Sequence, residues 1–317
     1  MEPAAGSLRN WCYYKPRGPH SGEYHRRDRL TVGYVFAYAE GVCEMPELPE
    51  VETVKQVLAP QIRGLRIAGI TVNDPKVVAR PSAEEFVREL KGEWITELER
   101  RGKFLSLCLE GGGRIVLHLR MTGSLLLTPP DFPLEKHTHL IFHLENGREL
   151  RFTDMRRFGR FWLIRSGEED LFSGVSRLGP EPFDEDFSAA YLSSALAKRK
   201  SAVKSCLLDQ EFIAGIGNIY ADESLFAANI RPERPACGLS VDECERLAAA
   251  IREALLTGIA ENRMSAEEYL AGKGRGYRSR YLNVYGRAGE PCRVCGERLL
   301  RAVVGGRGSV YCPKCQR

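Results

Sequence analysis

Two pairs of cysteines near the C-terminus constrain the fold of this chain more than any other feature of its sequence. Cys292 and Cys295 form one C-x2-C pair, Cys312 and Cys315 form a second, and 16 residues lie between the pairs. Thiolates at this spacing can complete a tetrahedral shell around one Zn²⁺ ion, although a disulfide or redox pair is an alternative. A module this short cannot form a core from its own side chains, so a closed structural zinc site would supply its folding free energy. We therefore expect a zinc-finger β-hairpin over residues 281–317.

Composition and charge narrow the class of protein. The chain has 317 residues, enough for two domains of ordinary size, and 43% hydrophobic with 28% charged residues is typical of a soluble globular protein. No apolar run reaches the roughly 18–20 residues that cross a bilayer, and no secretion signal is evident. The other six cysteines are scattered, which suits reduced thiols in a cytoplasm. Basic clusters at 100–103, 154–160, 198–204 and 272–280 can contact a polyanion, or they can be solvated faces.

The pattern of apolar residues predicts an α+β multidomain fold. A helical pattern follows Met45, and strand-like runs follow it at 66–72, 94–110, 113–128, 138–154 and 159–165, with a short helix at 84–91. These runs predict an antiparallel β-sandwich with flanking helices over residues 46–176. Residues 177–187 are expected to be a linker. Helical periods at 188–199, 203–208, 219–227, 240–259 and 265–271 then indicate a helical domain over 188–280.

The first part of the chain differs from the rest. Residues 1–44 show no apolar period and are rich in Arg, Tyr, Gly and Pro. Such a composition is typical of irregular or poorly ordered chain. We treat residues 1–45 as an N-terminal extension.

A glycine-rich turn precedes one of the predicted helices. Gly215 and Gly217 flank Ile216, and Asn218 follows at the helix start. Glycines allow close approach of the backbone, and the N–H groups of a helix start can bind a phosphate. No strand–helix–strand unit surrounds this turn, so it is not the dinucleotide-binding pattern. Two interpretations stay open: a helix–turn–helix element that grips a nucleic-acid backbone, or a helix cap followed by an ordinary turn.

Nine motifs together resemble those of the formamidopyrimidine-DNA glycosylase family. In chain order they are MPELPEVET (45–53), RRGKFL (100–105), HLRMTGSL (118–125), EKHTHL (135–140), TDMRRFG (153–159), LGPEP (178–182), GIGNIYADE (215–223), VYGRAGEPCRVCG (284–296) and RGSVYCPKCQ (307–316). The resemblance covers residues 45–317. It implies a bacterial base excision repair enzyme that excises oxidised purines, such as 8-oxoguanine and formamidopyrimidines, from duplex DNA. It also implies strand cleavage by β,δ-elimination and a helix-two-turn-helix arrangement in the helical domain.

The resemblance implies four catalytic residues, which are Pro46, Glu47, Lys103 and Arg307. Once Met45 is removed, Pro46 is a secondary amine whose lone pair can attack C1′ of the damaged nucleotide and form a Schiff base. Such a terminal amine titrates near neutral pH, so an unprotonated fraction is available. Glu47 would act as an acid or base on the deoxyribose. Lys103 would serve β-elimination and Arg307 would serve δ-elimination.

A second set of residues corresponds to DNA-binding positions of the family. Three of them would fill the void that a flipped base leaves: Met121, Arg156 and Phe158. The others would contact DNA, mostly its phosphates, or orient the site: Glu50, His137, Arg199, Lys204 and Asn218.

Two loops carry further expectations from the same resemblance. Met155 stands where the family commonly has proline, so the shape of the loop that carries Arg156 and Phe158 is left open. Residues 264–282 correspond to the loop that closes over the flipped base, and their glycines suit a movable segment.

Three alternatives compete with this interpretation. A sister group that resembles endonuclease VIII removes oxidised pyrimidines and shares the Pro-Glu start, the lysine and the zinc finger. The MPELPEVET start and the long 264–282 segment favour the purine enzyme. A damaged-DNA-binding protein without catalysis is the second alternative, should Pro46 never be exposed. A zinc-ribbon interaction protein is the third, and it leaves the N-terminal motifs unexplained.

The position of Met45 bears directly on the mechanism. An internal Pro46 has a tertiary amide nitrogen without a useful lone pair, and it cannot form an iminium. We therefore expect the working protein to begin at Met45, with residues 1–44 an over-long start assignment or a cleaved leader. We also expect a monomer that binds damaged double-stranded DNA, has no membrane contact, and works in the cytoplasm at the nucleoid.

Overall fold

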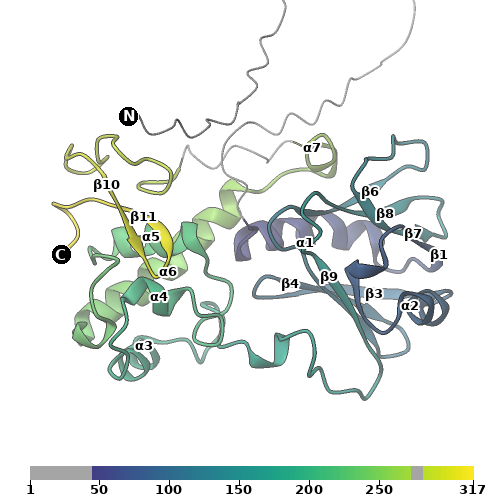
Figure 1. The fold of residues 1–317 in the computed structure, drawn as a ribbon, viewed down its shortest axis with the longest axis horizontal. Helices are drawn as coiled ribbons and strands as arrows, with labels where there is room; N and C mark the ends of the chain where they lie inside the picture. Colours follow the sequence, from purple (N-terminus) through teal and green to yellow (C-terminus); the bar gives the residue numbers. More distant parts are fainter. Residues whose placement is uncertain (1–44, 273–280) are drawn as a thin grey trace, which may run out of the picture. The chain divides into compact units, whose positions relative to one another are not determined.

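The computed structural model describes residues 45–272 and 281–317, so residues 1–44 of the N-terminal extension and the centre of the 264–282 loop lie outside the described residues. Figure 1 shows the ribbon coloured along the sequence, with most of the helices and strands labelled. The helices are α1 (Leu48–Ile62), α2 (Ala83–Leu90), α3 (Ala189–Leu196), α4 (Val203–Leu207), α5 (Asn218–Ala227), α6 (Val241–Glu261) and α7 (Ala266–Leu270). The strands are β1 (Ile67–Val72), β2 (Val78–Arg80), β3 (Ile95–Arg101), β4 (Phe104–Leu109), β5 (Arg114–His118), β6 (Gly123–Thr128), β7 (Thr138–Leu144), β8 (Glu149–Asp154), β9 (Arg160–Ile164), β10 (Leu300–Val304) and β11 (Arg307–Tyr311).

Two β-sheets pack face to face in the first part of the chain. Their strand orders are β1-β7-β8-β6 and β2-β9-β5-β4-β3. The centre of the Phe161 ring on β9 lies 6.1 Å from that of Phe142 on β7 and 5.0 Å from that of Phe152 on β8. One aromatic cluster therefore joins the two sheets. The strand pairs are antiparallel except β2 with β9, which is parallel and was not anticipated from the sequence. The expected β-sandwich is therefore confirmed.

The strand-like run at 113–128 is divided between the two sheets. Arg120 adopts a φ of 57° between β5 and β6, and this left-handed residue ends one strand and redirects the chain into the other sheet. The sequence shows apolar alternation on both sides of this point, so it does not reveal the change of sheet. Met121 lies on the resulting turn, at the edge of the sandwich.

Helix α1 reaches from the sandwich into the helical part. Val51, Val54 and Leu58 pack in the core of the sandwich, whereas Leu48 packs in the core formed by α3 to α6. Pro46 and Glu47 directly precede Leu48 in the chain. The start of α1 therefore places Pro46 and Glu47 where the sandwich meets the helical part.

The C-terminal hairpin docks on α5 and on the chain that follows it. β10 and β11 are joined at a tight turn in which Gly305 and Gly306 adopt φ values of 57° and 75°, a conformation that glycine tolerates best. Phe226 of α5 packs in the small core of the hairpin module. The buried Gln316 side chain donates to the Ile230 carbonyl at 2.8 Å. The expected α+β architecture of sandwich, helical part and zinc-finger hairpin is confirmed, while the boundaries at 176, 187 and 280 stay predictions.

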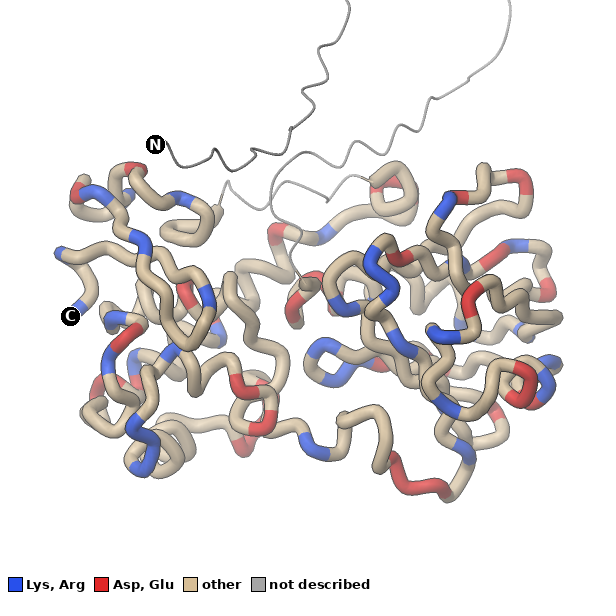
Figure 2. The backbone as a smooth tube through the Cα atoms, viewed as in Figure 1, with Lys and Arg blue, Asp and Glu red and all other residues tan. Residues whose placement is uncertain are grey.

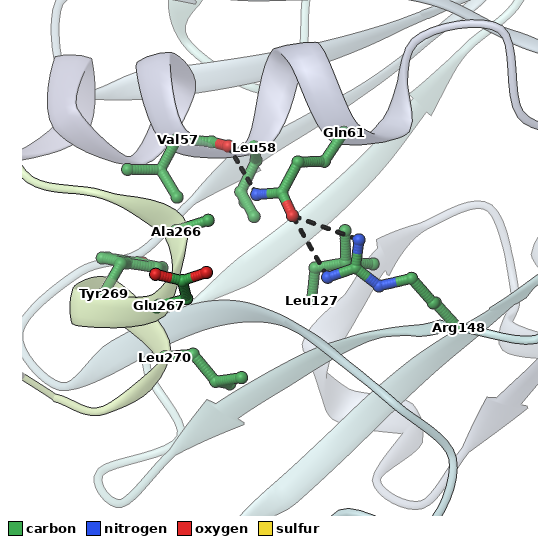
Figure 3. A pocket seen from close by; sticks show the side chains of 9 residues that line it. All are labelled: Val57, Leu58, Gln61, Leu127, Arg148, Ala266, Glu267, Tyr269 and Leu270. Atoms are coloured by element: carbon green, nitrogen blue, oxygen red, sulfur yellow. Dashed lines mark hydrogen bonds between the residues drawn. The ribbon is translucent and has the colours of Figure 1, made fainter.

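A small pocket of about 190 Å³ lies between α1, α7 and β6 (Figure 3). Gln61 accepts from both terminal nitrogens of Arg148 at 3.1 Å on one side, and the α7 residues Ala266 and Tyr269 close the other side. None of the site residues expected from the sequence lines this pocket. In the described residues, no helix has the length and apolar character that crossing a bilayer requires.

Candidate active site and nucleic-acid interface

Glu47 is the N-cap of α1, and its carboxylate is buried against the N-terminus of α5. The backbone N–H groups of Gly217 and Ile219 each donate to it at 2.8 Å, and that of Tyr220 donates at 3.3 Å. Only 3% of the Glu47 residue is exposed. Burial raises the pKa of this carboxyl, while the positive charge of Lys103 and the backbone hydrogen bonds act in the opposite direction. A carboxyl balanced in this way can hold and release a proton away from bulk water.

Two glycines allow this contact between distant segments. A Cβ on Gly217 would lie 2.3 Å from Cδ of Glu47, and one on Gly215 would lie 2.5 Å from Cδ1 of Leu48. Leu48 N–H also donates to the Gly215 carbonyl at 3.1 Å. The N–H groups of Gly217, Ile219 and Tyr220 are thus occupied by the protein's own Glu47 carboxylate, and a phosphate contact at this helix start stays a prediction.

Lys103 reaches the same segment from the sandwich. It lies in the tight turn between β3 and β4, and its Nζ donates to the Ile216 carbonyl at 2.8 Å. Burial lowers the pKa of the Lys103 ammonium, the negative charge of Glu47 opposes this, and the positive charge of Arg307 adds to the lowering. Residues 215–219 are thus the meeting point of the expected acid or base, Glu47, and the expected lysine of the elimination step.

Glu50 orients the start of α1 rather than facing outward. One of its carboxylate oxygens accepts from the Glu47 N–H at 2.9 Å, which completes a capping box. The other oxygen accepts from the Tyr220 hydroxyl and from the Asn262 side-chain amide, both at 3.1 Å. Glu50 therefore links α1 to α5 and to the end of α6. This placement supports the orienting part of the role expected for it.

Arg307 is the first residue of β11 and is exposed beside the glycine turn. The carbonyl of the next residue, Gly308, accepts from Lys204 Nζ at 3.0 Å and from the Asn218 side-chain amide at 3.1 Å. Lys204 also donates to the Ser309 hydroxyl at 2.7 Å. Two side chains from the helical part therefore hold the hairpin at the residues directly after Arg307.

Lys204 is paired inside the protein. Its Nζ lies 2.7 Å from Asp222 Oδ1, and both side chains have no exposed surface. Burial lowers the pKa of Lys204 and raises the pKa of Asp222 to about 6, and the attraction between the two charges opposes both shifts. Asp222 also accepts from the Val310 N–H at 2.9 Å. This buried position makes Lys204 a support for the hairpin, while a direct phosphate contact by Lys204 stays a prediction.

The three expected void-filling residues lie together at the edge of the sandwich. Arg156 Nη1 lies 2.9 Å from the Met121 sulfur, and the Arg156 guanidinium lies 4.9 Å from the centre of the Phe158 ring. The buried Asp154 carboxylate accepts from the N–H groups of Arg156 at 3.1 Å and Gly159 at 2.8 Å. The loop therefore holds the trio together although it lacks the proline common in the family.

His137 and Arg199 occupy different settings. The His137 carbonyl accepts from the Asp154 N–H at 3.0 Å, which places this histidine beside the loop of the void-filling trio. Arg199 pairs with Asp209 at 2.8 Å and lies over the Phe212 ring at 4.6 Å, so its partners are within the protein. Figure 2 shows Lys and Arg positions along both the sandwich and the helical part, interspersed with acidic positions.

The four cysteines of the C-terminal pairs converge as expected. The sulfur atoms of Cys292, Cys295, Cys312 and Cys315 all lie within 4.8 Å of one another. The Cys295 and Cys312 sulfurs are 3.5 Å apart, and those of Cys292 and Cys315 are 4.0 Å apart. Zn–S bonds of about 2.3 Å in a tetrahedron give S···S separations of roughly 3.8 Å. The residues therefore fit one Zn²⁺ ion with four thiolate ligands and no open position, which is a structural site.

Sequence reasoning missed an acidic pair that anchors the hairpin module. Asp222 holds Lys204 and β11, and its neighbour Glu223 accepts from the N–H groups of Val284 and Tyr285, both at 2.9 Å. Both acids are buried in a helix whose other buried residues are mostly apolar. Two adjacent acids in a helix with mostly apolar neighbours could have indicated this pair from the sequence, because charged side chains are rarely buried without partners.

A buried histidine beside Lys103 was also missed. His118 ends β5, its Nδ1 accepts from the Arg120 N–H at 2.9 Å, and its ring packs edge-on against Phe104 at 4.5 Å. Burial lowers the pKa of His118 to about 3, helped by the positive charges of Arg120 and Lys103. The ring is therefore neutral at physiological pH and forms an uncharged part of the wall next to Lys103.

Three protein-family models match consecutive parts of the chain. They are the formamidopyrimidine-DNA glycosylase N-terminal domain over residues 45–161, the formamidopyrimidine-DNA glycosylase H2TH domain over 178–269, and the zinc finger found in FPG and IleRS over 289–317. Among curated proteins, the formamidopyrimidine-DNA glycosylase of Moorella thermoacetica is 49% identical over 258 residues, 81% of this chain and 94% of the relative. That of Pelotomaculum thermopropionicum is 44% identical over 274 residues, 86% of this chain and 99% of the relative.

Solved structures of Lactococcus lactis Fpg share this fold. A crystal structure of its complex with DNA that contains an abasic site superposes with a TM-score of 0.78, at 36% identity, over 86% of this chain and 99% of that chain. A complex with DNA that contains FAPY-dG gives a TM-score of 0.78 at 36% identity, over 86% of this chain and 100% of that one. A complex with DNA that contains an oxidised pyrimidine gives 0.79 at 37% identity, with the same coverage.

Proposed function

Because this chain belongs to the formamidopyrimidine-DNA glycosylase family and is a DNA glycosylase of base excision repair, we propose that its described site excises oxidised purines through a Schiff base on Pro46. The observation that carries this proposal is the placement of Glu47. Its buried carboxylate sits at the α5 N-terminus, one residue after Pro46, with Lys103 at the same segment. A buried carboxyl group and an ammonium group thus accompany the proposed nucleophile.

The proposed chemistry begins at the free amine of Pro46. The nitrogen lone pair forms a bond to C1′ of the flipped nucleotide, the C1′–base bond breaks with its electron pair leaving on the base, and the proton that the Pro46 nitrogen gives up passes to the departing base. Glu47, whose carboxyl has a raised pKa, supplies a proton to the deoxyribose ring oxygen as the ring opens to the iminium. Loss of a C2′ proton then expels the 3′ phosphate, and a second elimination expels the 5′ phosphate. Lys103 assists the departure of the oxidised base and then serves the first elimination, and Arg307 serves the second.

The remaining residues are proposed to hold the DNA. Met121, Arg156 and Phe158 would occupy the space left by the flipped base, since they already form one cluster. His137, Arg199 and Asn218 would contact phosphates. To do so, Arg199 would leave its ion pair with Asp209 and pair with a phosphate instead. The four-cysteine zinc site would fix the hairpin that presents Arg307. We propose that the enzyme acts as a monomer on cellular DNA, in the cytoplasm at the nucleoid.

The lesion class is proposed from the relatives. The similar curated proteins are named for formamidopyrimidine, and one similar structure holds FAPY-dG in DNA. Another holds an oxidised pyrimidine, so a test must offer both lesion classes. Duplexes with one 8-oxoguanine opposite C, or with one thymine glycol, supply that comparison. Faster release of thymine glycol would move the enzyme toward the pyrimidine-excising sister group.

The test of the nucleophile compares two proteins that differ only in their N-terminus. One begins with Pro46 and the other has Pro46 inside the full 317-residue chain. Borohydride added during reaction with the 8-oxoguanine duplex should trap a covalent adduct with the first protein and none with the second. Tight binding without an adduct in the Pro46-first protein would refute the proposed covalent mechanism and leave a DNA-binding function.

A further inference from the structure

The segment between the sandwich and the helical part is fastened to the end of β3 by two arginines. Arg100 forms a bidentate pair with Glu181, at 2.5 Å from Nη1 to Oε1 and 3.0 Å from Nη2 to Oε2. Arg101 donates to Asp184 at 2.7 Å and to the Gly179 carbonyl at 2.9 Å. The two pairs differ in burial. The Arg100 and Glu181 side chains are 9% and 8% exposed, whereas those of Arg101 and Asp184 are 35% and 39% exposed.

Glu181 does more than pair with an arginine. Its Oε1 also accepts from the backbone N–H of Gly102, the residue directly before Lys103. Gly102 adopts a φ of 57°, and a Cβ there would lie 3.3 Å from Leu178 and 3.5 Å from the backbone nitrogen of Gly215. The backbone before Lys103 is therefore held by a buried carboxylate in a crowded position.

The other end of Lys103 is held by the turn that also binds Glu47. Lys103 Nζ donates to the Ile216 carbonyl at 2.8 Å, and Glu47 accepts from the Gly217 N–H at 2.8 Å. A shift of the Gly102 backbone would therefore move the Lys103 ammonium relative to Glu47. A fixed distance between two such groups is what proton transfer and elimination chemistry require.

Arg100 extends the same connection to α1. Its Nε donates to Glu52 at 2.7 Å, on the helix that begins directly after Glu47. The pairing with Glu181 and Glu52 raises the pKa of the Arg100 guanidinium although burial opposes this. Glu52, Arg100 and Glu181 thus form a buried charge group that joins α1, β3 and the linker around the Lys103 turn.

We propose that Glu181 is a positioning residue, which fixes the Gly102–Lys103 turn through the Gly102 N–H and Arg100 and thereby sets the place of the Lys103 ammonium beside Glu47. The proposal rests on the proposed role of Lys103 in the reaction. It assigns a purpose to the LGPEP motif, which otherwise is only a linker sequence. Glu181 itself does not contact the reacting atoms.

The test uses Glu181→Gln, which keeps the side-chain shape but removes the charge that Arg100 and the Gly102 N–H share. Asp184→Asn is the matched control, because it removes the charge of the neighbouring Arg101 pair while its side-chain oxygen can still accept from the Glu181 N–H. Single-turnover excision of 8-oxoguanine is measured with saturating enzyme that begins at Pro46. We expect Glu181→Gln to slow excision on the order of 10²-fold, the effect of a misplacement near 1 Å. Asp184→Asn should stay within a few-fold of the parent rate.

A double-mutant cycle separates positioning from mere support of the fold. In a Lys103→Ala background, Glu181→Gln should cause little further slowing, because the group that it positions is already absent. Equal slowing in both backgrounds, or slowing no greater than that of Asp184→Asn, would overturn the proposal. Should Lys103→Ala excise at the parent rate, the proposed role of Lys103 itself fails, which is a different result.

Folding is controlled within the same series. Thermal unfolding of each variant is recorded, and Glu181→Asp replaces Glu181→Gln if the latter unfolds below the assay temperature. Asp keeps the charge near Arg100 but withdraws the carboxylate from the Gly102 N–H by one methylene. It should therefore slow excision while it largely keeps the unfolding temperature. A parent-like rate for a folded Glu181→Asp would contradict the assignment.

Discussion

Gly217→Ala should displace the Glu47 carboxylate with only one added methyl group. The Cβ would lie 2.3 Å from Cδ and 2.5 Å from Oε1 of Glu47, while ordinary contacts begin at 3.4 Å. The carboxylate must therefore withdraw by about 1 Å, and it loses some of the hydrogen bonds from Gly217, Ile219 and Tyr220. The φ of Gly217 is −127°, which alanine adopts readily, so the effect is steric rather than a backbone strain.

The magnitude follows from this displacement. Overpacking at a buried site costs about 1–3 kcal/mol of the free energy of unfolding. A shift near 1 Å at a reacting group costs on the order of 10²-fold in rate. We therefore expect Gly217→Ala to fold, with a lowered thermal midpoint, and to excise 8-oxoguanine on the order of 10²-fold more slowly under single-turnover conditions.

Two further variants make this prediction decisive. Gly238→Ala is the control, because its Cβ would meet nothing within 4 Å, and it should match the parent in rate and midpoint. Glu47→Asp added to Gly217→Ala shortens the clashing side chain and should restore part of the lost stability. Parent-like excision and stability in Gly217→Ala would show that Glu47 is not held at the α5 N-terminus.

Three other perturbations test separate parts of the structure. The pKa of His118 is lowered to about 3 in the folded state, against about 6.5 in the unfolded state, so this group adds stability above pH 6.5 that is lost as the pH falls toward 3. The parent should therefore lose about 2 kcal/mol of unfolding free energy from this group between about pH 7 and pH 5. Denaturant titrations at the two pH values should show a correspondingly smaller loss for His118→Asn. Lys204→Met leaves Asp222 buried without its partner and should lower the free energy of unfolding by about 3–5 kcal/mol. The double variant Lys204→Met with Asp222→Leu should recover most of this loss. Equal unfolding free energies for the single and double variants would contradict the buried pair. Cys312→Ser should release zinc, which a chromogenic chelator measures, and it should weaken DNA binding because the hairpin is no longer fixed. Retention of one zinc ion per chain would contradict the four-thiolate site.

The zinc site and most of the helices and strands could be predicted from local patterns. Cysteine spacing within 24 residues fixes which sulfurs can meet, and α5, α6 and α7 begin within a residue or two of their expected positions. Short-range information is enough there, since capping, periodicity and turn residues act over a few positions. The division of 113–128 between two sheets could not be foreseen, because it depends on one left-handed residue, Arg120, within a continuous apolar pattern.

The contacts within the site could not be predicted from local sequence patterns. Local sequence patterns identify the chemical groups that are present: a proline and a glutamate after Met45, a lysine, an arginine beside glycines and four thiolates. Folding brings the Gly217 N–H to Glu47, which lies 170 residues away in the chain, and no local pattern predicts that contact. The tertiary structure also decided that Lys204 is buried with Asp222 and that Glu181 holds the turn before Lys103. The physical reason is that a charge acquires its role from its burial and its partner, and both are set by segments that meet only when the chain is folded.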